Sequence, residues 1–484
     1  MSIRLSHLLL HDAQLPKIGD MQISGVTSDS RDVQPGFVFV ALPGIKADGA
    51  SFIPQAIANG AVAVVCQTGN FSSDVAIQSE NPRQLLSVMA ARFYDRQPDT
   101  IVAVTGTNGK TSVTVFVRQI WEAMGFRAAS LGTIGVVGPN GSEYLSHTTP
   151  DPVKLQALAA SLRDDHVQHL AIEASSHGLA QYRLDGLRLT AAAFTNLTRD
   201  HLDYHATLDD YFNAKMRLFD ELLPTSAVAV INADMPEAAE ILDHVKAKGL
   251  RAFTVGNKGA DLCLLETKRL GLGQSLKIKS ATATYDISLP LVGEFQASNA
   301  LVAAGLVIAS GGEETLALHA LESLKGARGR LELAGVTQAG ASIFVDYAHT
   351  PDALETAITA LRPSADKKLV VVFGCGGDRD KGKRPLMGEI AGRLADVTYV
   401  TDDNPRTEDA AQIRREILSA VPQAIEIGDR ATAILKAVKS LGAGDILLVA
   451  GKGHEEGQTV GKTIIPFSDH DAVAAALRGE NYHG

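Results

Sequence analysis

Short runs of apolar, often β-branched residues recur along the chain, and each is followed by a Gly-rich or polar turn and then a helical pattern. Fully apolar strands that alternate with amphipathic helices are typical of parallel sheets covered on both faces. The stretch Ser275–Leu291 alternates polar and apolar residues instead, which predicts a small antiparallel hairpin. The overall pattern therefore predicts an α/β fold. The predicted parallel strands are Thr100–Thr105, Leu170–Glu173, Ala191–Thr195, Ala227–Ile231, Leu369–Phe373, Val397–Thr401 and Ile446–Ala450.

The spacing of these runs divides the chain into three predicted domains. Residues 1–95 hold short strands and turns and predict a small N-terminal α/β domain. Residues 96–330 hold the first parallel sheet, with the predicted hairpin, and resemble a P-loop ATPase in their pattern. Residues 331–484 begin with new strands and predict a Rossmann-like C-terminal domain.

Charge and cysteine content exclude several classes of protein. The 484 residues include 45 Lys+Arg and 55 Asp+Glu, a formal net charge of −10, which disfavours non-specific binding to nucleic acid. Cys66, Cys263 and Cys375 are odd in number and far apart, so the sequence predicts neither a disulfide framework nor a clustered zinc site and favours a reducing cytoplasm. No run approaches the ~18 apolar residues that a membrane span requires. We therefore expect a cytoplasmic protein without a membrane span.

A nucleotide-binding loop is the strongest chemical signal. The strand Ile101–Val104 leads into the Gly-rich segment Thr105–Ser112, and a helical pattern follows. Glycines let backbone N–H groups approach phosphates, and the helix dipole favours their negative charge. Lys110 can reach the terminal phosphates, and Thr111 can place a hydroxyl on Mg²⁺. Because an apolar residue, Val104, occupies the first glycine position of the general P-loop pattern, the match is incomplete.

Several residues after the phosphate loop could bind metal. Glu173 ends a core strand, where a carboxylate is well placed for Mg²⁺, although a solvated strand-end glutamate is the alternative. His201 and His205 lie in a predicted loop that is rich in ligand-type groups. Histidines at this spacing are more often hydrogen-bonding surface residues than ligands, so their spacing alone decides nothing.

Lys215 lies on the apolar face of a predicted helix. Thr207 and Asp210 form a capping-box pattern at the start of this helix, and the apolar stripe that follows includes the position of Lys215. One interpretation is a lysine that extends along the apolar surface to water. The alternative is a buried lysine whose neutral amine is available for chemistry. The sequence pattern leaves both open.

Charged loops follow the strands of the third region. Phe344–Asp352 ends a strand in an acid, and Phe373–Pro385, Thr401–Arg406 and Gly451–Glu455 each leave a strand with charged side chains. Carboxyl ends of parallel strands meet at one edge of an open α/β sheet, which is where such sheets bind ligands. Solvated loops are charged as well, but three together predict a second ligand site.

The motifs taken together resemble those of the Mur ligases, over nearly the whole chain. They are Gly-Thr-Asn-Gly-Lys-Thr, Glu-Ala-Ser-Ser-His-Gly, Thr-Arg-Asp-His-Leu-Asp-Tyr-His, Gly-Arg-Leu-Glu and Asp-Tyr-Ala-His-Thr-Pro-Asp. Members of this family are ATP-dependent, amide-forming enzymes of peptidoglycan synthesis. The run Asp403–Arg406 is similar to that of the members that add meso-diaminopimelate to UDP-N-acetylmuramoyl-L-alanyl-D-glutamate, with ADP and phosphate as products. The resemblance thus implies ATP as co-substrate, Mg²⁺ as cofactor and a UDP-binding N-terminal domain, and we expect a monomer.

The resemblance also implies roles for individual residues. Lys110, Glu173, His201 and Lys215 are the implied catalytic group, with Thr111, Glu173, His201 and Lys215 as metal ligands. Lys215 would act as N6-carboxylysine, formed with CO₂. The implied ATP site is Gly106, Thr107, Asn108, Gly109, Lys110, Thr111, Ser112, Asn299, Arg330 and Asp346. The implied UDP-substrate site is Ser28, Ser30, Ile45, Lys46, Ala47, His147, Thr148, Thr149, Ser175, Gln181 and Arg183. The implied diaminopimelate site is Arg379, Asp403, Asn404, Pro405, Arg406, Gly451 and Glu455.

Two other functions share part of this pattern. A folylpolyglutamate synthetase would have the same phosphate loop and lysine, but the N-terminal 95 residues and Asp403–Arg406 argue against it. A lysine-adding relative typically lacks the arginine of that motif. A nucleotide switch that binds without chemistry would normally carry Asn-Lys-x-Asp for guanine, which the sequence lacks. A further alternative concerns Arg406 itself, which could brace its own loop through Asp402 or Glu408.

Overall fold

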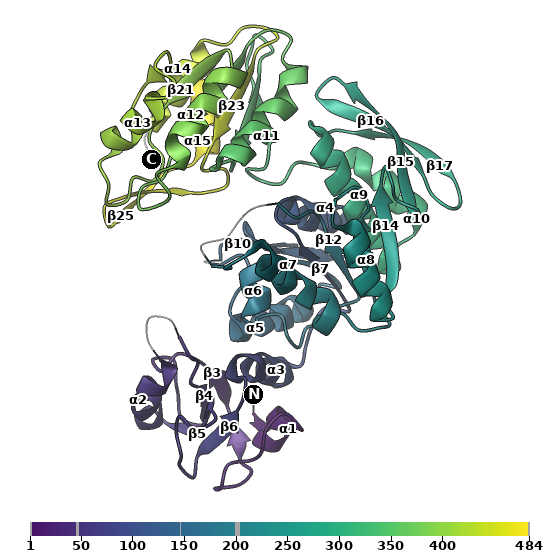
Figure 1. Ribbon diagram of the computed structural model, residues 1–484, viewed down its shortest axis with the longest axis vertical. Coiled ribbons are helices and arrows are strands. Elements are labelled where there is room, and N and C mark those ends of the chain that lie inside the picture. The colour runs from purple at the N-terminus through teal and green to yellow at the C-terminus, as the bar shows by residue number, and fades with distance from the viewer. Residues whose placement is uncertain (1, 45–47, 146, 199–203, 483–484) are drawn as a thin grey trace. The chain divides into compact units, whose positions relative to one another are not determined.

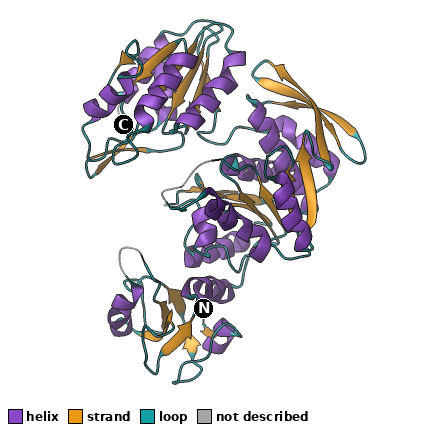
Figure 2. Cartoon of the chain, in the orientation of Figure 1, coloured by secondary structure: helices purple, strands orange, loops and turns teal. Residues whose placement is uncertain are grey.

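The computed structural model describes residues 2–44, 48–145, 147–198 and 204–482. The chain forms two compact units, which are described separately below. The first unit contains residues 1–265, 278–284 and 298–320, and the second contains residues 266–277, 285–297 and 321–484. Figures 1 and 2 show that both units combine strands with covering helices, which confirms the predicted α/β class. The predicted division into three domains at residues 95 and 330 stays a prediction.

The N-terminal part of the first unit is a small parallel sheet with helices on both faces. Its strands follow chain order, β3 (Gly25–Thr27), β4 (Phe37–Val40), β5 (Ala61–Gln67) and β6 (Ala76–Ser79). Val38 and Val40 face α1 (Leu5–Leu9) and α3 (Pro82–Tyr94), whereas Phe39 faces α2 (Ile53–Ala58). This alternation is what a strand buried on both faces requires. The remaining elements here are β1 (Ile3–Arg4), β2 (Gln22–Ile23) and the 3₁₀ turn Gly49–Phe52.

The larger sheet of the first unit carries the phosphate loop. Its order is β10-β9-β8-β11-β7-β12-β13-β14-β15, and β16 and β17 follow in the same sheet with residues that belong to both units. Strands β8, β11, β7, β12, β13, β14 and β15 run parallel to one another in this sheet order. Strands β9 and β10 extend the sheet beyond β8 in antiparallel orientation. The bounds are β7 (Thr100–Thr105), β8 (Ala128–Gly132), β9 (Gly135–Gly138), β10 (Gly141–Glu143), β11 (His169–Glu173), β12 (Ala191–Phe194), β13 (Val228–Asn232), β14 (Arg251–Gly256), β15 (Leu262–Leu270), β16 (Gly273–Lys279) and β17 (Thr284–Leu289).

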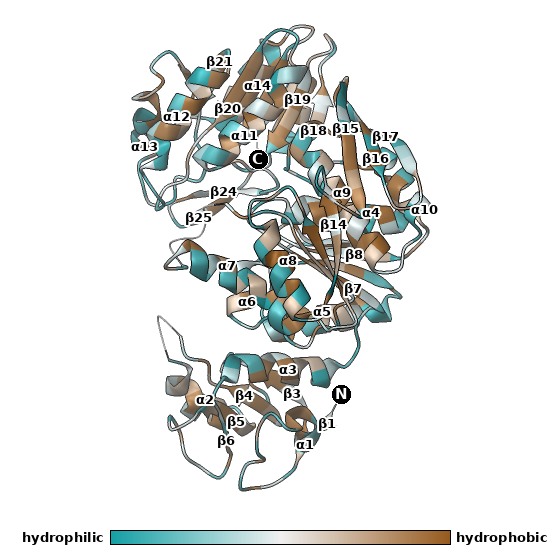
Figure 3. Ribbon diagram, turned by 45° about the vertical axis from the view of Figure 1, so that its right-hand side comes forward, coloured by the Kyte–Doolittle hydropathy of each residue, from teal (hydrophilic) through white to brown (hydrophobic). Residues whose placement is uncertain are grey.

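Helices cover both faces of this sheet. Ile101 and Ala103 of β7 belong to a core shared with α5, α7 and α8, while α4 contacts β7, β8 and β11 from the other side. Figure 3 shows the central strands of this sheet as predominantly hydrophobic, as a doubly covered sheet requires, whereas β16 and β17 are partly hydrophilic. The helices are α4 (Lys110–Ala123), α5 (Pro152–Asp164), α6 (Ser176–Ala180), α7 (Leu208–Arg217), the π-helix Leu218–Leu222, α8 (Ala238–Ala247), α9 (Glu294–Ala309), α10 (Glu314–His319) and the 3₁₀ turn Ala320–Ser323.

The second unit is built on a six-stranded sheet of order β18-β19-β23-β20-β21-β22. All its strands run parallel except β18. In β20, Val371 packs with α11, α12 and α13, and Val372 packs with α14 and α15. The bounds are β18 (Glu332–Val336), β19 (Ser342–Asp346), β20 (Leu369–Phe373), β21 (Val397–Val400), β22 (Ile425–Glu426), β23 (Ile446–Ala450), β24 (Gly457–Val460), β25 (Thr463–Pro466), α11 (Pro351–Leu361), α12 (Lys383–Leu394), α13 (Ala410–Leu418), α14 (Arg430–Lys439), α15 (Asp469–Leu477) and the 3₁₀ turn Arg362–Ser364.

The strand predictions are confirmed with small shifts at the ends. Strands β7, β20 and β23 have the predicted bounds, and β16 and β17 form the predicted hairpin around a short turn. The parallel order of β19, β23, β20 and β21 brings the charged loops of the second unit to one edge of its sheet, also as predicted. Among the described residues, none of the helices combines the length and hydropathy needed to cross a bilayer.

Candidate active site

The phosphate loop lies between β7 and the N-terminus of α4. Gly106 and Gly109 have φ angles of 139° and 84°, which L-residues with side chains rarely adopt. A Cβ on Gly106 would lie 2.0 Å from Thr195 Oγ1, and one on Gly109 would lie 2.4 Å from Asn299 Oδ1. The loop therefore needs glycine for both conformation and space. It opens onto the 14-residue helix α4, whose N-terminus favours anions.

The Lys110 side chain folds back onto this loop and contacts its backbone. Its Nζ donates to the carbonyl oxygens of Gly106 at 2.9 Å and Thr107 at 2.7 Å. The segment after β12 holds the loop from the other side, because the Asn108 N–H donates to Asn196 Oδ1 at 2.9 Å. Thr195 Oγ1 also donates to the Asn108 carbonyl at 2.6 Å. The ammonium thus lies against the predicted phosphate loop, and its contact with a nucleotide stays a prediction.

Lys215 reaches the same loop from α7. Only 1% of the Lys215 surface is exposed, so the interpretation that it extends to water is wrong. Its Nζ donates to the Gly106 carbonyl at 2.8 Å and lies 4.1 Å from the centre of the Tyr211 ring. The predicted capping box is present, with Thr207 and Asp210 bonding each other's backbone N–H groups. The helix start thereby fixes which residues of α7 face inward.

Glu173 ends β11, next to the strand that leads into the phosphate loop. It is opposite Val104 of β7 in the parallel register, and its side chain is buried. Thr133 donates twice to the carboxylate, from its N–H to Oε1 at 2.8 Å and from its hydroxyl to Oε2 at 3.2 Å. A Cβ on Gly132 would lie 2.0 Å from Oε1. The carboxylate is therefore held in a close-fitting site and is not a solvated strand end.

A polar group that includes five of the predicted UDP-substrate residues adjoins Glu173. The Thr148 and Thr133 hydroxyls are 3.1 Å apart, and the Thr149 hydroxyl donates to the Glu173 carbonyl at 2.9 Å. Arg183 donates to the Thr149 carbonyl at 2.6 Å, and burial lowers its pKa. Ser175 and Gln181 complete this group through hydrogen bonds to Thr149 and Arg183.

The other predicted UDP-substrate residues have fewer contacts to report, and three of them are not described. Ser28 and Ser30 follow β3 in the N-terminal sheet, where the Ser30 hydroxyl donates to Gln55 Oε1 at 3.0 Å. His147 is exposed beside Thr148. Residues Ile45, Lys46, Ala47 and His201 lie outside the described residues, so their predicted roles stay predictions.

The second unit brings the predicted amino-acid residues together at the edge of its sheet. Asn404 Nδ2 donates to Glu455 Oε2 at 2.8 Å, and a Cβ on Gly451 would lie 2.7 Å from Asp403 Oδ2. Arg406 has a left-handed φ of 52° and donates to the Gly377 carbonyl at 2.8 Å. The same close approach brings the Pro405 carbonyl against Gly377. Arg379 is exposed on that loop and forms no hydrogen bond within the described part of the chain.

The alternative that Arg406 braces its own loop through Asp402 or Glu408 is wrong, because both carboxylates pair with other arginines. Asp402 is paired with Arg414, and Glu408 with Arg384, at 3.0 Å. The Arg406 guanidinium instead braces the loop 376–378 through its hydrogen bond to the Gly377 carbonyl.

Arg330 and Asp346, predicted at the nucleotide, belong to the second unit. The Asp346 carboxylate accepts from the Leu331 N–H at 2.6 Å and from the Ala348 N–H at 2.7 Å. Burial raises the pKa of Asp346, and the nearby Arg330 guanidinium opposes that rise. Arg330 lies 4.9 Å from the centre of the Tyr347 ring. The predicted nucleotide residues thus occur in both units, with Gly106–Ser112 and Asn299 in the first.

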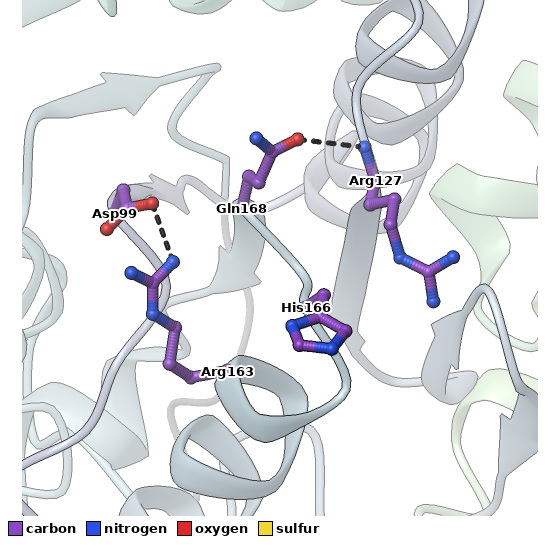
Figure 4. A pocket seen from close by; sticks show the side chains of 5 residues that line it. All are labelled: Asp99, Arg127, Arg163, His166 and Gln168. Atoms are coloured by element: carbon purple, nitrogen blue, oxygen red, sulfur yellow. Dashed lines mark hydrogen bonds and ion pairs between the residues drawn. The ribbon is translucent and has the colours of Figure 1, made fainter.

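Two hollows of the surface lie away from these groups. One of about 520 Å³ is lined by Asp99, Arg127, Arg163, His166 and Gln168 (Figure 4). It lies at the amino ends of β7, β8 and β11, opposite the phosphate loop. Its arginines are already engaged, since Arg163 donates to Asp99 at 2.6 Å and Arg127 to the Asp165 carbonyl at 3.1 Å. We therefore assign the site from its chemistry and not from the size of a cavity.

Comparison with known proteins identifies the class. The "Mur ligase family, catalytic domain" matches residues 22–94, the "Mur ligase middle domain" matches residues 104–307, and the "Mur ligase, glutamate ligase domain" matches residues 329–453. The chain therefore belongs to the Mur ligase family, which confirms the resemblance seen in the sequence.

Individual relatives show which members of the family the chain is similar to. A protein of Brucella melitensis named UDP-N-acetylmuramoyl-L-alanyl-D-glutamate–2,6-diaminopimelate ligase is 52% identical over 479 residues, which cover 98% of each chain. A solved structure of a ligase with the same name is 32% identical, covers 100% of both chains and has a TM-score of 0.74. A folylpolyglutamate synthase structure from Mycobacterium tuberculosis, with ADP and AMPPCP, covers 74% of this chain and 89% of its own at 19% identity and a TM-score of 0.61. At that identity the last match shows a shared fold alone.

Proposed function

We propose that this protein is an ATP-dependent ligase that joins meso-2,6-diaminopimelate to the D-glutamyl γ-carboxylate of UDP-N-acetylmuramoyl-L-alanyl-D-glutamate, in peptidoglycan synthesis. The observation that carries the proposal is the arrangement at the phosphate loop. Lys110 and Lys215 both donate to the Gly106 carbonyl, and Glu173 ends the neighbouring strand. The end-to-end similarity to ligases of that name supports the choice of substrates.

The reaction requires two bond exchanges. The γ-phosphoryl group passes from ATP to a γ-carboxylate oxygen, which gives ADP and an acyl phosphate. The amine nitrogen then attacks the acyl carbon, the bond from that carbon to the phosphate oxygen breaks, and the nitrogen loses a proton. Lys110 and the N-terminus of α4 bind and neutralise the phosphates in both steps, because they present N–H donors to the developing charge.

The residues around Glu173 fit a Mg²⁺ ion. The described residues contain no group of three or more His, Cys, Asp or Glu side chains that could hold a metal. Mg²⁺ commonly takes only one or two carboxylates and completes its shell with water and substrate phosphates. A bound Mg²⁺ would supply charge neutralisation at the phosphates, and Glu173 and Thr111 would hold it. His201 is proposed as a further ligand.

Lys215 is proposed to be carbamylated in the active protein. Its neutral amine would add CO₂, forming an N–C bond and releasing one proton, and the product is an anionic carbamate. The lysine is almost completely buried, so conversion of its cation to an oxygen ligand would serve a metal beside the phosphate loop. The burial and the contact with Gly106 support this proposal.

The remaining sites follow the grouping of the residues. We assign the UDP substrate to Ser28, Ser30 and the group around Thr148, Thr149, Ser175, Gln181 and Arg183. We assign the nucleotide also to Asn299, Arg330 and Asp346. Loss of the Arg183 guanidinium should raise the KM for the UDP substrate and leave the KM for the amine unchanged.

The amine is proposed to be diaminopimelate because Arg406 can bind its distal carboxylate. A guanidinium fork suits a carboxylate bidentately, and lysine would place an ammonium there instead. Such a mismatch should cost at least ~3 kcal/mol, or about a hundredfold in specificity. Arg406→Ala should therefore raise the KM for diaminopimelate steeply. Because Arg406 also braces Gly377, Arg406→Lys is the matched control: it keeps the charge and removes the fork.

An amino-acid panel tests the whole assignment. Purified protein with ATP, Mg²⁺ and the UDP-muramyl dipeptide should release phosphate with meso-diaminopimelate, and about a hundredfold less efficiently with lysine. Folate in place of the dipeptide should support no release, which distinguishes a folylpolyglutamate synthetase. Release that does not depend on the amine would indicate a nucleotide switch and would refute the ligase. We further propose that the protein acts as a cytoplasmic monomer, which size-exclusion chromatography with light scattering would test.

A further inference from the structure

A buried lysine lies beneath the proposed amino-acid site. Lys452 follows β23 and has no exposed surface. Its Nζ donates to Asn404 Oδ1 at 3.2 Å, to Glu455 Oε2 at 2.9 Å and to the Gly457 carbonyl at 2.6 Å. An ammonium has three N–H groups, and each of them has an acceptor here. Lys452 therefore has no remaining donor for a substrate, and it can act only through its partners.

The contacts of Lys452 decide the orientation of the Asn404 amide. Asn404 Oδ1 accepts from Lys452 and from the Thr459 N–H at 2.8 Å, so this end of the amide must be the oxygen. The nitrogen end then faces Glu455 and donates to its Oε2 at 2.8 Å. If the amide were flipped, its N–H groups would point at two donors. The ammonium thus fixes which side of Asn404 presents N–H groups.

The two oxygens of the Glu455 carboxylate differ in their hydrogen bonds. Oε2 accepts hydrogen bonds from Lys452 and Asn404, whereas Oε1 forms no hydrogen bond among the described residues. The Glu455 side chain is 31% exposed, so one oxygen of a fixed carboxylate remains available at the surface. An N–H donor on Asn404 and a carboxylate acceptor on Glu455 then lie side by side. Such a pair matches the carboxylate and ammonium of an α-amino acid.

We propose that Lys452 is a positioning residue of the amino-acid site, which holds Asn404 and Glu455 in the orientation that binds the ammonium-and-carboxylate end of the amine substrate. This inference rests on the proposed function. Removal of the lysine should therefore weaken amine binding and leave ATP binding nearly unchanged.

Other charged groups near Glu455 have partners of their own. Arg430 is fully buried and bound to Asp469 at 2.7 Å, and Asp403 also acts on it. Glu456, beside Glu455, is paired with Arg328 at 3.1 Å. His454 lies next in the chain, with its ring 5.1 Å from that of Tyr347. Because Arg430 is committed to Asp469, Lys452 is the cation that directly contacts Glu455.

The test compares Lys452→Met with Glu455→Gln, the double variant, and Lys462→Met as a matched control in the exposed turn between β24 and β25. We measure kcat and KM for meso-diaminopimelate and for ATP. Lys452→Met should raise the KM for diaminopimelate at least tenfold and change the KM for ATP less than twofold. Lys462→Met should match the wild type.

The double variant tests whether the two residues act as a unit. Its KM for diaminopimelate should lie within about twofold of that of Glu455→Gln, since residues in one network are not additive. An unchanged KM for diaminopimelate in Lys452→Met, equal changes for ATP and diaminopimelate, or additive effects in the double variant would overturn the inference. If Lys452→Met alone does not fold, the double variant decides, and a wild-type KM there overturns the inference. Failure of the wild type to use diaminopimelate would instead refute the proposed function.

Discussion

Replacement of Gly132 by alanine should displace the Glu173 carboxylate without any change in Glu173 itself. Gly132 ends β8, and its φ is not in the left-handed region, so the backbone accepts alanine. The added Cβ would lie 2.0 Å from Oε1, 2.5 Å from Cδ and 2.6 Å from Cγ of Glu173. No such contact is tolerated, so the carboxylate must move by about 1 Å or more. A shift of that size in a catalytic group costs roughly a hundredfold in rate.

The same shift has a predictable effect on stability. Moving the carboxylate breaks the hydrogen bonds from Thr133, and a charged acceptor of this kind contributes about 1.5–3 kcal/mol. Overpacking of a buried site adds about 1–3 kcal/mol. In a Glu173→Ala background these three contacts are absent, and the preference of a strand for alanine over glycine, about 0.5–1 kcal/mol, opposes any remaining cost. The destabilisation by alanine should therefore largely disappear when position 173 is alanine.

Measurements of phosphate release and thermal unfolding on four variants test the predicted clash between position 132 and Glu173. These are Gly132→Ala, Glu173→Ala, the double variant and the control Gly138→Ala, whose Cβ would meet only Ala129 and Leu162 at 3.4 and 3.8 Å. The control should keep wild-type rate and stability. If Gly132→Ala keeps its kcat within about threefold, or if its destabilisation persists in the Glu173→Ala background, the geometry inferred for Glu173 is wrong.

Three further predictions concern individual charges. Lys110→Ala should lower turnover by at least ~10²–10³-fold, because a cation at the transferred phosphoryl group is lost; near-normal turnover with an unchanged circular dichroism spectrum would contradict the phosphate-loop assignment. Lys215→Ala should be nearly inactive and partly rescued by acetate, whereas Lys215→Arg stays inactive; full activity of the wild type after rigorous CO₂ depletion would refute the carbamate. The Arg384 guanidinium lowers the pKa of Glu408 to about 2, below its value of ~4.3 in an unfolded chain. Glu408 therefore stabilises the fold above about pH 4.3, and this contribution is lost as the pH falls toward 2, so Glu408→Gln should flatten the loss of thermal stability in acid; an unchanged profile would contradict it.

Local patterns in the sequence predicted the elements and the phosphate loop because their causes are local. An apolar run next to a glycine turn needs no distant partner to be recognised, and β7 has the predicted bounds. The capping box at Thr207 is likewise encoded within four residues, and the apolar stripe after it predicted that Lys215 lies on the apolar face, while leaving open whether its amine is buried. Such features depend on backbone sterics and on hydrogen bonds between near neighbours.

The support of the site could not be predicted in this way, because it depends on contacts between distant parts of the chain. Thr133 and Glu173 are 40 residues apart, and Lys452 and Asn404 are 48 apart. Nothing in the sequence around Thr133 distinguishes it from any other threonine after a strand. For Lys452, the signal was its place between two predicted amino-acid residues, Gly451 and Glu455, but its burial appears only in the fold.

Both sheets position their charged groups by the same physical means. Glu173 at the end of β11 is fixed by Thr133, and Asn404 and Glu455 beyond the ends of β21 and β23 are fixed by Lys452. At Glu173 the two donors of Thr133 hold both carboxylate oxygens, whereas at Glu455 the partners hold Oε2 and leave Oε1 for a ligand. A group held in this way need not reorganise when charge develops, which is where preorganised sites gain most of their effect. The orientation of each group depends on both partners, because removal of the supporting residue leaves the other side chain without the contacts that direct it. Single substitutions at Glu173 or Glu455 would therefore report a sum of lost contact and lost orientation, and only the paired variants with Gly132 and Lys452 separate the two.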